Sequence, residues 1–150
     1  EFPRSGLVIV GDGAERKNLE FRIQNLELVQ NMRFEGWQDD PALYYKGADL
    51  YLLTSNFEGY GRSVVEAAWA GLPVVMTDVG IAGEIIKDRE TGIVVPVKSQ
   101  SALAKALLDA RRNHNEMRRM AKKAFDLVSA RSPLTKNDYL KMYRDSFMYE

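Results

Sequence analysis

Residues 57–75 read F-E-G-Y-G-R-S-V-V-E-A-A-W-A-G-L-P-V-V and contain, in order, a glycine-rich turn, a helical pattern and an apolar run. The helical pattern has two faces, because apolar side chains recur at the three- and four-residue spacing of a helix core. The apolar face comprises Val64, Val65, Ala68, Trp69 and Leu72, and the other face comprises Arg62, Glu66 and Ala70. A helix that leads into a buried strand is typical of a parallel β-α-β unit.

The same alternation of apolar runs and helical patterns extends in both directions from this stretch. The runs predict strands at Leu7–Val10, Met32–Gly36, 50–54, 73–77 and 92–95. Helical spacing predicts helices at 14–26, 41–46, 61–70, 83–87, around 103–110, around 117–128 and at 134–148. This order predicts an α/β fold, a Rossmann-like parallel sheet with helices on both faces, followed by C-terminal helices.

The sequence also makes local predictions about burial and capping. Leu7–Val10 is apolar at every position, so we expect this strand to be buried on both faces. Trp69 is expected in the core because it lies on the apolar helix face. Asp39 or Asp40 should cap the helix at 41–46, and Asn115 should cap the helix at 117–128.

The composition limits the classes of protein to consider. The chain has 150 residues, which suits one domain, and its 21 basic and 21 acidic side chains cancel. This balance does not favour nucleic-acid binding, which usually shows a basic excess. The absence of cysteine excludes disulfides and thiolate metal sites and fits a cytoplasmic location. No apolar run approaches the roughly 20 residues of a transmembrane helix.

The glycine-rich turn before the helix has the chemistry of an anion site. The loops after the strands at Leu7–Val10, 50–54 and 73–77 should meet at one sheet edge, where such folds bind ligands. Gly59 and Gly61 let the backbone approach a ligand without a Cβ between them. The helix begins near Gly61, and its first amides lack intrahelical partners and lie at the positive end of the helix dipole. This arrangement favours a phosphate.

Two carboxylates flank the predicted anion site. Glu66 lies on the second turn of the helix, where it could accept hydrogen bonds from a diol, and Glu58 precedes the glycines. A ligand with a diol, then phosphates, then a second polyol would meet Glu66, the Gly-Tyr-Gly amides and Glu58 in turn. That ligand is a nucleotide sugar. Two simpler interpretations stay open: Glu66 pairs only with Arg62 at i,i+4, and Glu58 is a solvated loop residue.

The pattern E-G-Y-G-R-S-V-V-E-A at 58–67, followed by G-L-P-V-V at 71–75, resembles the signature of the group 1 (family 4) glycosyltransferases. These are retaining enzymes of the two-lobed GT-B fold. Further segments resemble the family in the same order: V-G-D-G at 10–13, F-E-G at 34–36, A-D-L at 48–50, T-D-V-G at 77–80, A-G-E at 82–84 and T-G at 91–92. The resemblance covers nearly the whole chain up to the final predicted helix.

The resemblance implies a role for each candidate residue. Glu58, the candidate catalytic residue, would contact hydroxyls of the transferred sugar, and Glu66 would hold the ribose hydroxyls of the donor. The amides of Gly59, Tyr60 and Gly61 would take the diphosphate. The other substrate-binding candidates are Gly11, Gly13, Trp37, Ser55 and Arg62. The family needs no metal ion, so we expect no metal and no cofactor, with a nucleoside diphosphate sugar as the donor substrate.

The sequence departs from the family pattern in two places. Arg62 stands where many members carry an apolar residue, and a cation near a helix N-terminus opposes the helix dipole unless a carboxylate or a phosphate neutralises it. The family's first strand, which is central in its sheet, and the following Lys-Gly segment are not found before Leu7. We therefore expect one of two arrangements: either the sheet is interrupted between the strands at Leu7–Val10 and 50–54, or these two strands pair directly and the flanking helices repack. We also expect 1–150 to be the C-terminal donor-binding lobe of a longer enzyme, inactive without its N-terminal acceptor-binding lobe.

The function that this resemblance implies is the transfer of a sugar from a nucleoside diphosphate to an acceptor, with retention of configuration, in polysaccharide or glycolipid assembly. The alternatives are a nucleotide-sugar epimerase of the same fold and a non-catalytic nucleotide-binding or interaction module. Trp37 is either a platform for the base or a loop anchor, and Tyr44 and Tyr45 are interpreted as packing residues. The basic clusters at 111–112, 118–119 and 122–123 form a solvated helix face or, alternatively, a peripheral contact with an anionic membrane.

Overall fold

The computed structural model describes residues 5–131, and the predicted helix at 134–148 lies outside these residues. The chain divides into two compact units, Glu1–Leu43 and Tyr44–Glu150, which are described separately. A short helix, α2 (Ala42–Gly47), begins at the end of the first unit. The Asp40 carboxylate accepts a hydrogen bond of 3.0 Å from the Ala42 amide, so Asp40 rather than Asp39 caps this helix.

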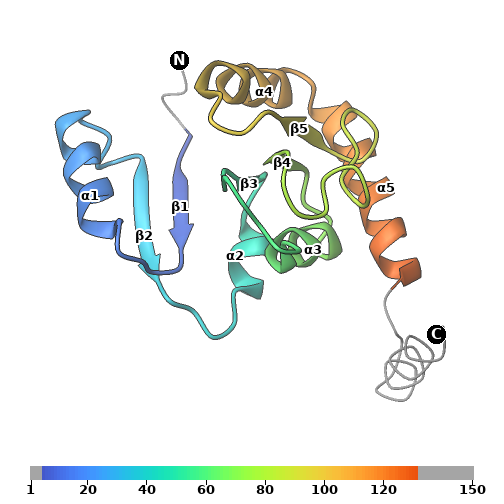
Figure 1. The fold of residues 1–150 in the computed structure, drawn as a ribbon, viewed down its shortest axis with the longest axis horizontal. Helices are drawn as coiled ribbons and strands as arrows, with labels where there is room; N and C mark the ends of the chain where they lie inside the picture. Colours follow the sequence, from blue (N-terminus) through green and yellow to red (C-terminus); the bar gives the residue numbers. More distant parts are fainter. Residues whose placement is uncertain (1–4, 132–150) are drawn as a thin grey trace. The chain divides into compact units, whose positions relative to one another are not determined.

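The first unit consists of two parallel strands and one helix: β1 (Leu7–Val10), α1 (Arg16–Asn25) and β2 (Met32–Gly36) (Figure 1). Leu7 pairs with Met32 and Ile9 with Phe34, and a bulge between Ile9 and Val10 shifts the register at the end of the ladder. Both strands have the predicted bounds. The chain therefore enters the loop after β1 from an irregular strand end.

The predicted burial of β1 on both faces is wrong for the described residues. Leu7, Val8 and Val10 are exposed, Val8 to 49% of its surface. Among the described residues, β1 has one ladder partner, β2, and Ile23 is the buried residue of α1. One neighbouring strand and one helix cannot cover two faces and two edges of a strand.

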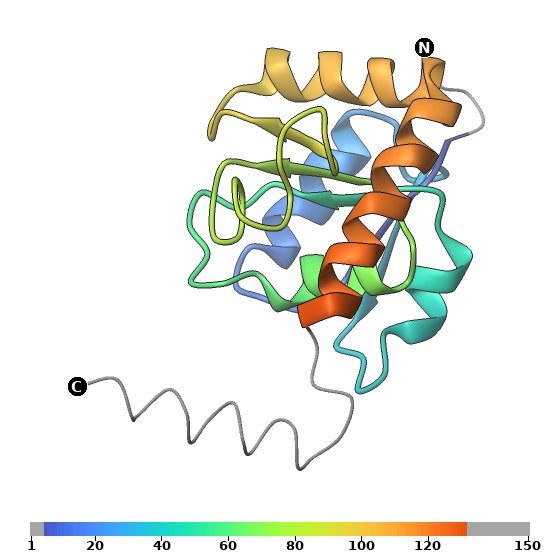
Figure 2. The same ribbon diagram turned by 90° about the vertical axis from the view of Figure 1, so that its right-hand side faces the viewer.

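The second unit holds a three-stranded parallel sheet in the order β3-β4-β5, made by β3 (Tyr51–Leu53), β4 (Val74–Thr77) and β5 (Ile93–Val95). The helix α3 (Arg62–Trp69) connects β3 to β4. Two longer helices, α4 (Gln100–Arg112) and α5 (His114–Arg131), follow β5, and the chain turns sharply between them (Figure 2).

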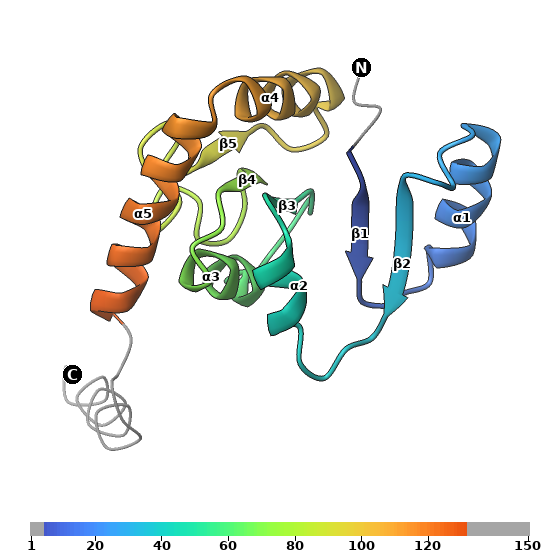
Figure 3. The same ribbon diagram turned by 180° about the vertical axis from the view of Figure 1, so that it is seen from behind.

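Helices cover both faces of this sheet, as the sequence predicted. Val74 and Met76 of β4 pack in one cluster with Val64 of α3 and with residues of α5. Val75, which points to the opposite face, packs in a second cluster with Ala106 of α4 and with residues at the start of α5. Figures 1 and 3 show α3 and α4 on opposite sides of these strands.

The ladders of the described residues form two separate sheets, one in each unit, and no ladder joins β1 to β3, in agreement with the first of the two predicted arrangements. Within the described part of the chain, β1 pairs only with β2, and β3 pairs only with β4. Each of the strands at Leu7–Val10 and Tyr51–Leu53 thus has one ladder partner among residues 5–131.

Three local predictions are wrong. No helix forms at 83–87, because Gly83 adopts a left-handed φ of +80° and its amide bonds to the carbonyl of Ile86 at 2.8 Å. Asn115 lies inside α5 rather than capping it, since the Met117 amide already bonds to the Asn113 carbonyl. Trp69 is 49% exposed, because the buried stripe of α3 consists of Val64, Ala67 and Ala68 and does not include position 69.

Candidate functional site

The loop between β3 and α3 is held by hydrogen bonds at its base. The Ser55 hydroxyl donates to Oε1 of Glu58 at 2.8 Å, which fixes this half-buried carboxylate. The hydroxyl of Thr77, a buried residue at the end of β4, donates to the Ser55 carbonyl at 2.6 Å. Glu58 is therefore a positioned acceptor and not a freely solvated loop residue.

A second loop, which follows β4, packs directly against the backbone of the signature turn. The Ile81 amide donates to the Tyr60 carbonyl at 3.1 Å. Gly80 has a left-handed φ of +55°, and a Cβ at this position would lie 2.6 Å from the Tyr60 carbonyl oxygen and 3.2 Å from Cβ of Glu58. Only glycine fits there without displacing the turn. Gly80 ends the T-D-V-G segment at 77–80, and the sequence pattern alone did not indicate this contact.

The N-terminus of α3 has no side-chain cap among the described residues. Gly61 precedes the helix with φ +90° and ψ +53°. The Val64 amide donates to the Gly61 carbonyl at 3.0 Å and is the first amide of α3 with a backbone acceptor. Helix geometry leaves the preceding amides, those of Arg62 and Ser63, without intrahelical acceptors at the positive end of the helix dipole. The turn at Gly59, Tyr60 and Gly61 leads directly into them.

Glu66 lies one turn into α3 and contacts two different groups. The Tyr45 hydroxyl donates to Oε2 of Glu66 at 3.0 Å. Arg62 Nη2 lies 3.9 Å from Oε1 of Glu66, and the side chains of Arg62 and Glu66 are 88% and 40% exposed. The predicted i,i+4 ion pair is thus present, but at this distance and exposure it contributes little. The Glu66 carboxylate keeps solvent-exposed acceptor capacity.

The contact between Tyr45 and Glu66 was not predicted from the sequence. The Tyr45 ring lies 6.0 Å from the ring of Tyr51 at an interplanar angle of 56°, so the prediction of packing is correct for the ring alone. Burial, with a further contribution from Glu66, raises the pKa of Tyr45, so the hydroxyl stays protonated and remains a donor. Burial also raises the pKa of Tyr51, whose hydroxyl donates to Ser63 Oγ at 2.7 Å.

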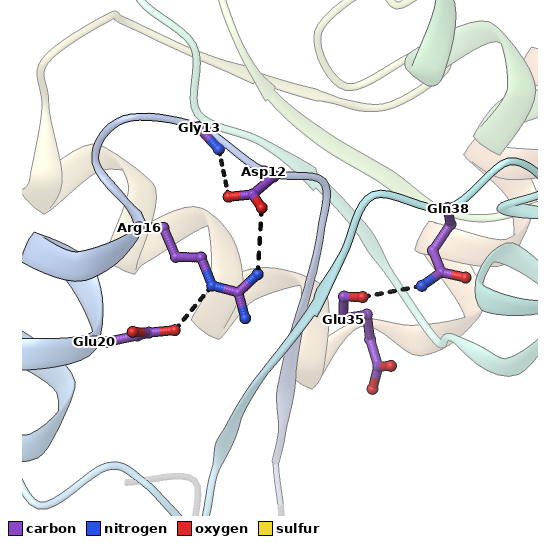
Figure 4. Close-up of polar contacts among 6 residues, drawn as sticks. All are labelled: Asp12, Gly13, Arg16, Glu20, Glu35 and Gln38. Carbon is purple, nitrogen blue, oxygen red and sulfur yellow. Dashed lines mark hydrogen bonds and ion pairs between the residues drawn. The ribbon is translucent and has the colours of Figure 1, made fainter.

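In the first unit, the glycine loop after β1 is held by backbone and side-chain contacts. The Gly11 amide donates to the Gly36 carbonyl at 2.7 Å, and the Gly13 amide donates to Oδ1 of Asp12 at 2.8 Å. Arg16 lies between two carboxylates, with Nε 2.9 Å from Glu20 Oε1 and Nη1 3.6 Å from Asp12 Oδ2 (Figure 4). The hydrogen bond that Arg16 donates to the Glu20 carboxylate raises the pKa of Arg16. No Cβ contact would restrict Gly11 or Gly13.

Trp37 follows β2 and is 77% exposed. Its indole Nε1 donates to Asp39 Oδ1 at 3.1 Å, which ties the ring to its own loop. The side-chain nitrogen Nε2 of Gln38 donates to the backbone carbonyl of Glu35 at 2.9 Å and holds the start of this loop (Figure 4). The indole is therefore both anchored at its edge and open on its faces, so the platform and anchor interpretations both stay open.

The candidates divide between the two units. Gly11, Gly13 and Trp37 lie in the first unit. The second unit contains Ser55, Glu58, Gly59, Tyr60, Gly61, Arg62 and Glu66. Within residues 5–131, no group of three or more His, Asp or Glu side chains is arranged to hold a metal ion. In the same range, no helix combines the length and the apolar composition that crossing a membrane requires.

Comparison with known proteins assigns the chain to a family. The family model of the group 1 glycosyl transferases matches residues 1–126. The chain therefore belongs to the group 1 glycosyl transferases, as its signature residues predicted.

Two relatives illustrate this membership. The chain is 31% identical over 106 residues to the lipopolysaccharide core biosynthesis glycosyltransferase LpsE of Rhizobium meliloti, covering 71% of this chain and 31% of LpsE. It is 38% identical over 110 residues to a phosphatidyl-myo-inositol mannosyltransferase of Mycobacterium leprae, covering 71% of this chain and 29% of that protein. The chain thus spans about a third of the length of these curated relatives.

The fold matches solved structures of the same kind. The crystal structure of Anabaena HepE in complex with UDP aligns with a TM-score of 0.85 at 25% identity, over 97% of this chain and 42% of HepE. A second structure of HepE was solved with UDP and glucose. This likeness confirms the predicted fold class, parallel strands with helices on both faces as in GT-B glycosyltransferases.

Proposed function

We propose that this chain is the donor-binding lobe of a retaining glycosyltransferase of family 4, and that it binds a nucleoside diphosphate sugar. The observation that carries the proposal is the uncapped N-terminus of α3, which begins after the left-handed Gly61 between two acceptor carboxylates. Glu58 on one side is fixed by Ser55, and Glu66 on the other keeps exposed acceptor capacity. Family membership and the UDP complexes of HepE support the same ligand class.

In this proposal each group has one task. The amides of the Gly59–Gly61 turn and of the first turn of α3 bind the diphosphate and stabilise it as the leaving group, an electrostatic contribution of several kcal/mol in enzymes. Glu66 accepts the ribose hydroxyls, and Glu58 accepts hydroxyls of the transferred sugar. Helix amides and cations neutralise the diphosphate, with no metal ion required.

The acceptor side of the reaction belongs to the proposal as well. We place the reaction in polysaccharide or glycolipid assembly, because both curated relatives described above carry names of that kind. The cytoplasmic location and a peripheral membrane contact of α5 stay predictions. Two cations of the basic clusters are already paired within α5, Arg119 with Glu116 and Lys122 with Asp126, which lowers the charge of that face.

The direct test is a calorimetric titration of the full-length protein with UDP and with GDP. We expect one of the two to bind, and Glu66→Gln to weaken that binding about tenfold, because a neutral amide accepts hydroxyl donors less well than a carboxylate. The fold should persist, since Glu66 is partly exposed and the substitution leaves the side-chain volume unchanged. Unaltered affinity in Glu66→Gln would contradict the ribose assignment.

Turnover then separates the remaining possibilities. Release of nucleoside diphosphate that depends on an acceptor would establish transfer, and proton NMR of the product linkage would establish whether the configuration is retained. Binding without turnover in the full-length protein would support the non-catalytic module instead. Interconversion of the free nucleotide sugar would support the epimerase.

A further inference from the structure

The Glu66 carboxylate is held from a second helix. Tyr45 of α2 reaches Glu66 of α3 across 21 positions in the sequence, with 3.0 Å between its hydroxyl and Oε2. The Tyr45 ring is itself fixed against Tyr51 of β3. Both tyrosines and Glu66 belong to the second unit, so this contact is internal to one compact body.

Without Tyr45, little in the described part of the chain would restrain this carboxylate. A partly exposed glutamate samples several rotamers, and ordering it when a ligand binds costs conformational entropy. The other neighbour, Arg62, lies at 3.9 Å with most of its side chain in solvent, so it cannot fix the orientation. The tyrosine hydroxyl, by contrast, sits on a ring that packing has already immobilised.

We propose that Tyr45 is a positioning residue that holds the Glu66 carboxylate in the orientation that accepts the ribose hydroxyls, and that it thereby sets the preference for a ribonucleotide. The proposal rests on the proposed function, because that function assigns Glu66 to the ribose. Tyr45 occupies one acceptor position of Oε2 and leaves the remaining lone pairs of the carboxylate for a diol. Preorganisation of this kind strengthens binding by removing an ordering cost and not by adding a contact.

The experiment measures how strongly the full-length protein distinguishes a ribose from a sugar without its diol. The probe is the nucleotide, UDP or GDP, that binds in the titration described above, together with its 2′,3′-dideoxy analogue. We define the discrimination as the ratio of the two dissociation constants. For the wild-type protein we expect the dideoxy analogue to bind about tenfold more weakly or worse, the loss that follows when hydrogen bonds to a charged acceptor are removed.

The test variant is Tyr45→Phe, which keeps the ring and its packing and removes only the hydroxyl. We expect its discrimination to fall about three- to tenfold, while affinity for the dideoxy analogue stays unchanged. The matched control is Tyr51→Phe, which removes the neighbouring hydroxyl, bonded to Ser63 and not to Glu66. Its discrimination should equal that of the wild-type protein. Thermal unfolding of both variants is the control for stability: equal melting temperatures would show that a change in discrimination does not result from partial unfolding.

A cycle with Glu66→Gln tests whether Tyr45 acts through Glu66. In the Glu66→Gln background, adding Tyr45→Phe should cause no further loss of discrimination. An equal loss in both backgrounds would overturn the positioning role and would place Tyr45 itself on the ribose.

The possible failures are distinguishable. If Glu66→Gln lowers discrimination and Tyr45→Phe does not, the inference is wrong and the proposed function stands. If the wild-type protein binds neither UDP nor GDP, the proposed function itself is wrong. If it binds one of them but does not discriminate against the dideoxy form, the assignment of Glu66 to the ribose is wrong, and the inference about Tyr45 is wrong with it.

Discussion

The strands β1 and β4 have similar sequences and very different surroundings. L-V-I-V in β1 and V-V-M-T in β4 both read as buried strands of a parallel sheet. Every residue of β4 is buried, whereas Leu7, Val8 and Val10 of β1 are exposed. β4 has a ladder partner on each side and helices on both faces, while β1 has one partner among the described residues. An apolar run thus predicts a strand, but its neighbours decide its burial.

The loops after these two strands show the same contrast. Gly80 after β4 and Gly11 after β1 both have positive φ angles, +55° and +122°. A Cβ at Gly80 would lie 2.6 Å from the Tyr60 carbonyl oxygen, whereas a Cβ at Gly11 would have no neighbour within 4 Å. Of these two glycines, only Gly80 is packed tightly against a second segment, and that segment is the signature turn.

Replacing these two glycines should have the largest effect and should sharpen the contrast. Gly80→Ala adds a clash of roughly 1–3 kcal/mol to a backbone strain of the same size, so we expect a loss of about 2–6 kcal/mol in unfolding free energy. Gly11→Ala should show the strain alone, about 1–3 kcal/mol. Urea unfolding measures both. Gly80→Ala should also weaken nucleotide binding, because the Tyr60 backbone must move.

Equal losses of unfolding free energy in the two glycine variants would mean that the turn at Tyr60 moves away from position 80 at little cost. The loop after β4 would then not hold the signature turn in place, and the contrast between Gly80 and Gly11 would not hold.

The next largest effect is expected from a matched pair of core substitutions. Val75→Ala in β4 removes two fully buried methyl groups and should lower the unfolding free energy by about 2–3 kcal/mol, from lost burial and the cavity left behind. Val8→Ala in β1 removes the same atoms from a half-exposed position and should cost about 1 kcal/mol or less. Urea unfolding of this 150-residue chain tests the pair. A cost at Val8 equal to that at Val75 would show that another surface covers β1 in solution.

The sequence was informative wherever a local pattern decides the structure. The five strands and the helix of the signature were predicted because a short apolar run and a 3.6-residue period are local signals. The false helix at 83–87 has acceptable spacing, yet Gly83 needs a left-handed backbone to bring its amide to Ile86. The burial of β1 and the exposure of Trp69 could not be predicted, since both depend on what packs against each element.

The candidate site divides in the same way. The order of Glu58, the glycines and Glu66 along the chain could be read directly, because the helix places them at known intervals. The contacts of Ser55 with Glu58 and of Arg62 with Glu66 are also local, three and four residues apart. Tyr45 and Gly80 were missed because their contacts with Glu66 and Tyr60 join different elements. No periodicity or spacing in a single sequence indicates such contacts.

The two units also differ in how an arginine at the start of a helix is neutralised. Arg16 and Arg62 each stand in the first turn of a helix that follows a glycine loop. Arg16 is held between Asp12 and Glu20 and lies 5.6 Å from the Phe34 ring centroid, so its contacts are satisfied within the protein. Arg62 has one distant carboxylate and is almost fully exposed. A cation at a helix N-terminus opposes the dipole, and a bound anion beside Arg62 would offset this cost.

The smallest expected effect on stability is that of Arg62→Leu. Because the pair with Glu66 is long and exposed, we expect the unfolding free energy to change by no more than about 0.5 kcal/mol. Arg16→Leu, the matched control, should destabilise the protein measurably because it breaks two ion pairs and the contact with Phe34. If Arg62 binds the diphosphate, Arg62→Leu should weaken nucleoside diphosphate binding and leave nucleoside binding unchanged, as measured by calorimetry. Unchanged diphosphate affinity together with a small loss of stability would instead show that Arg62 only forms an ion pair with Glu66. Arg16 and Arg62 would then differ only in how strong their ion pairs are, and neither would bind the ligand.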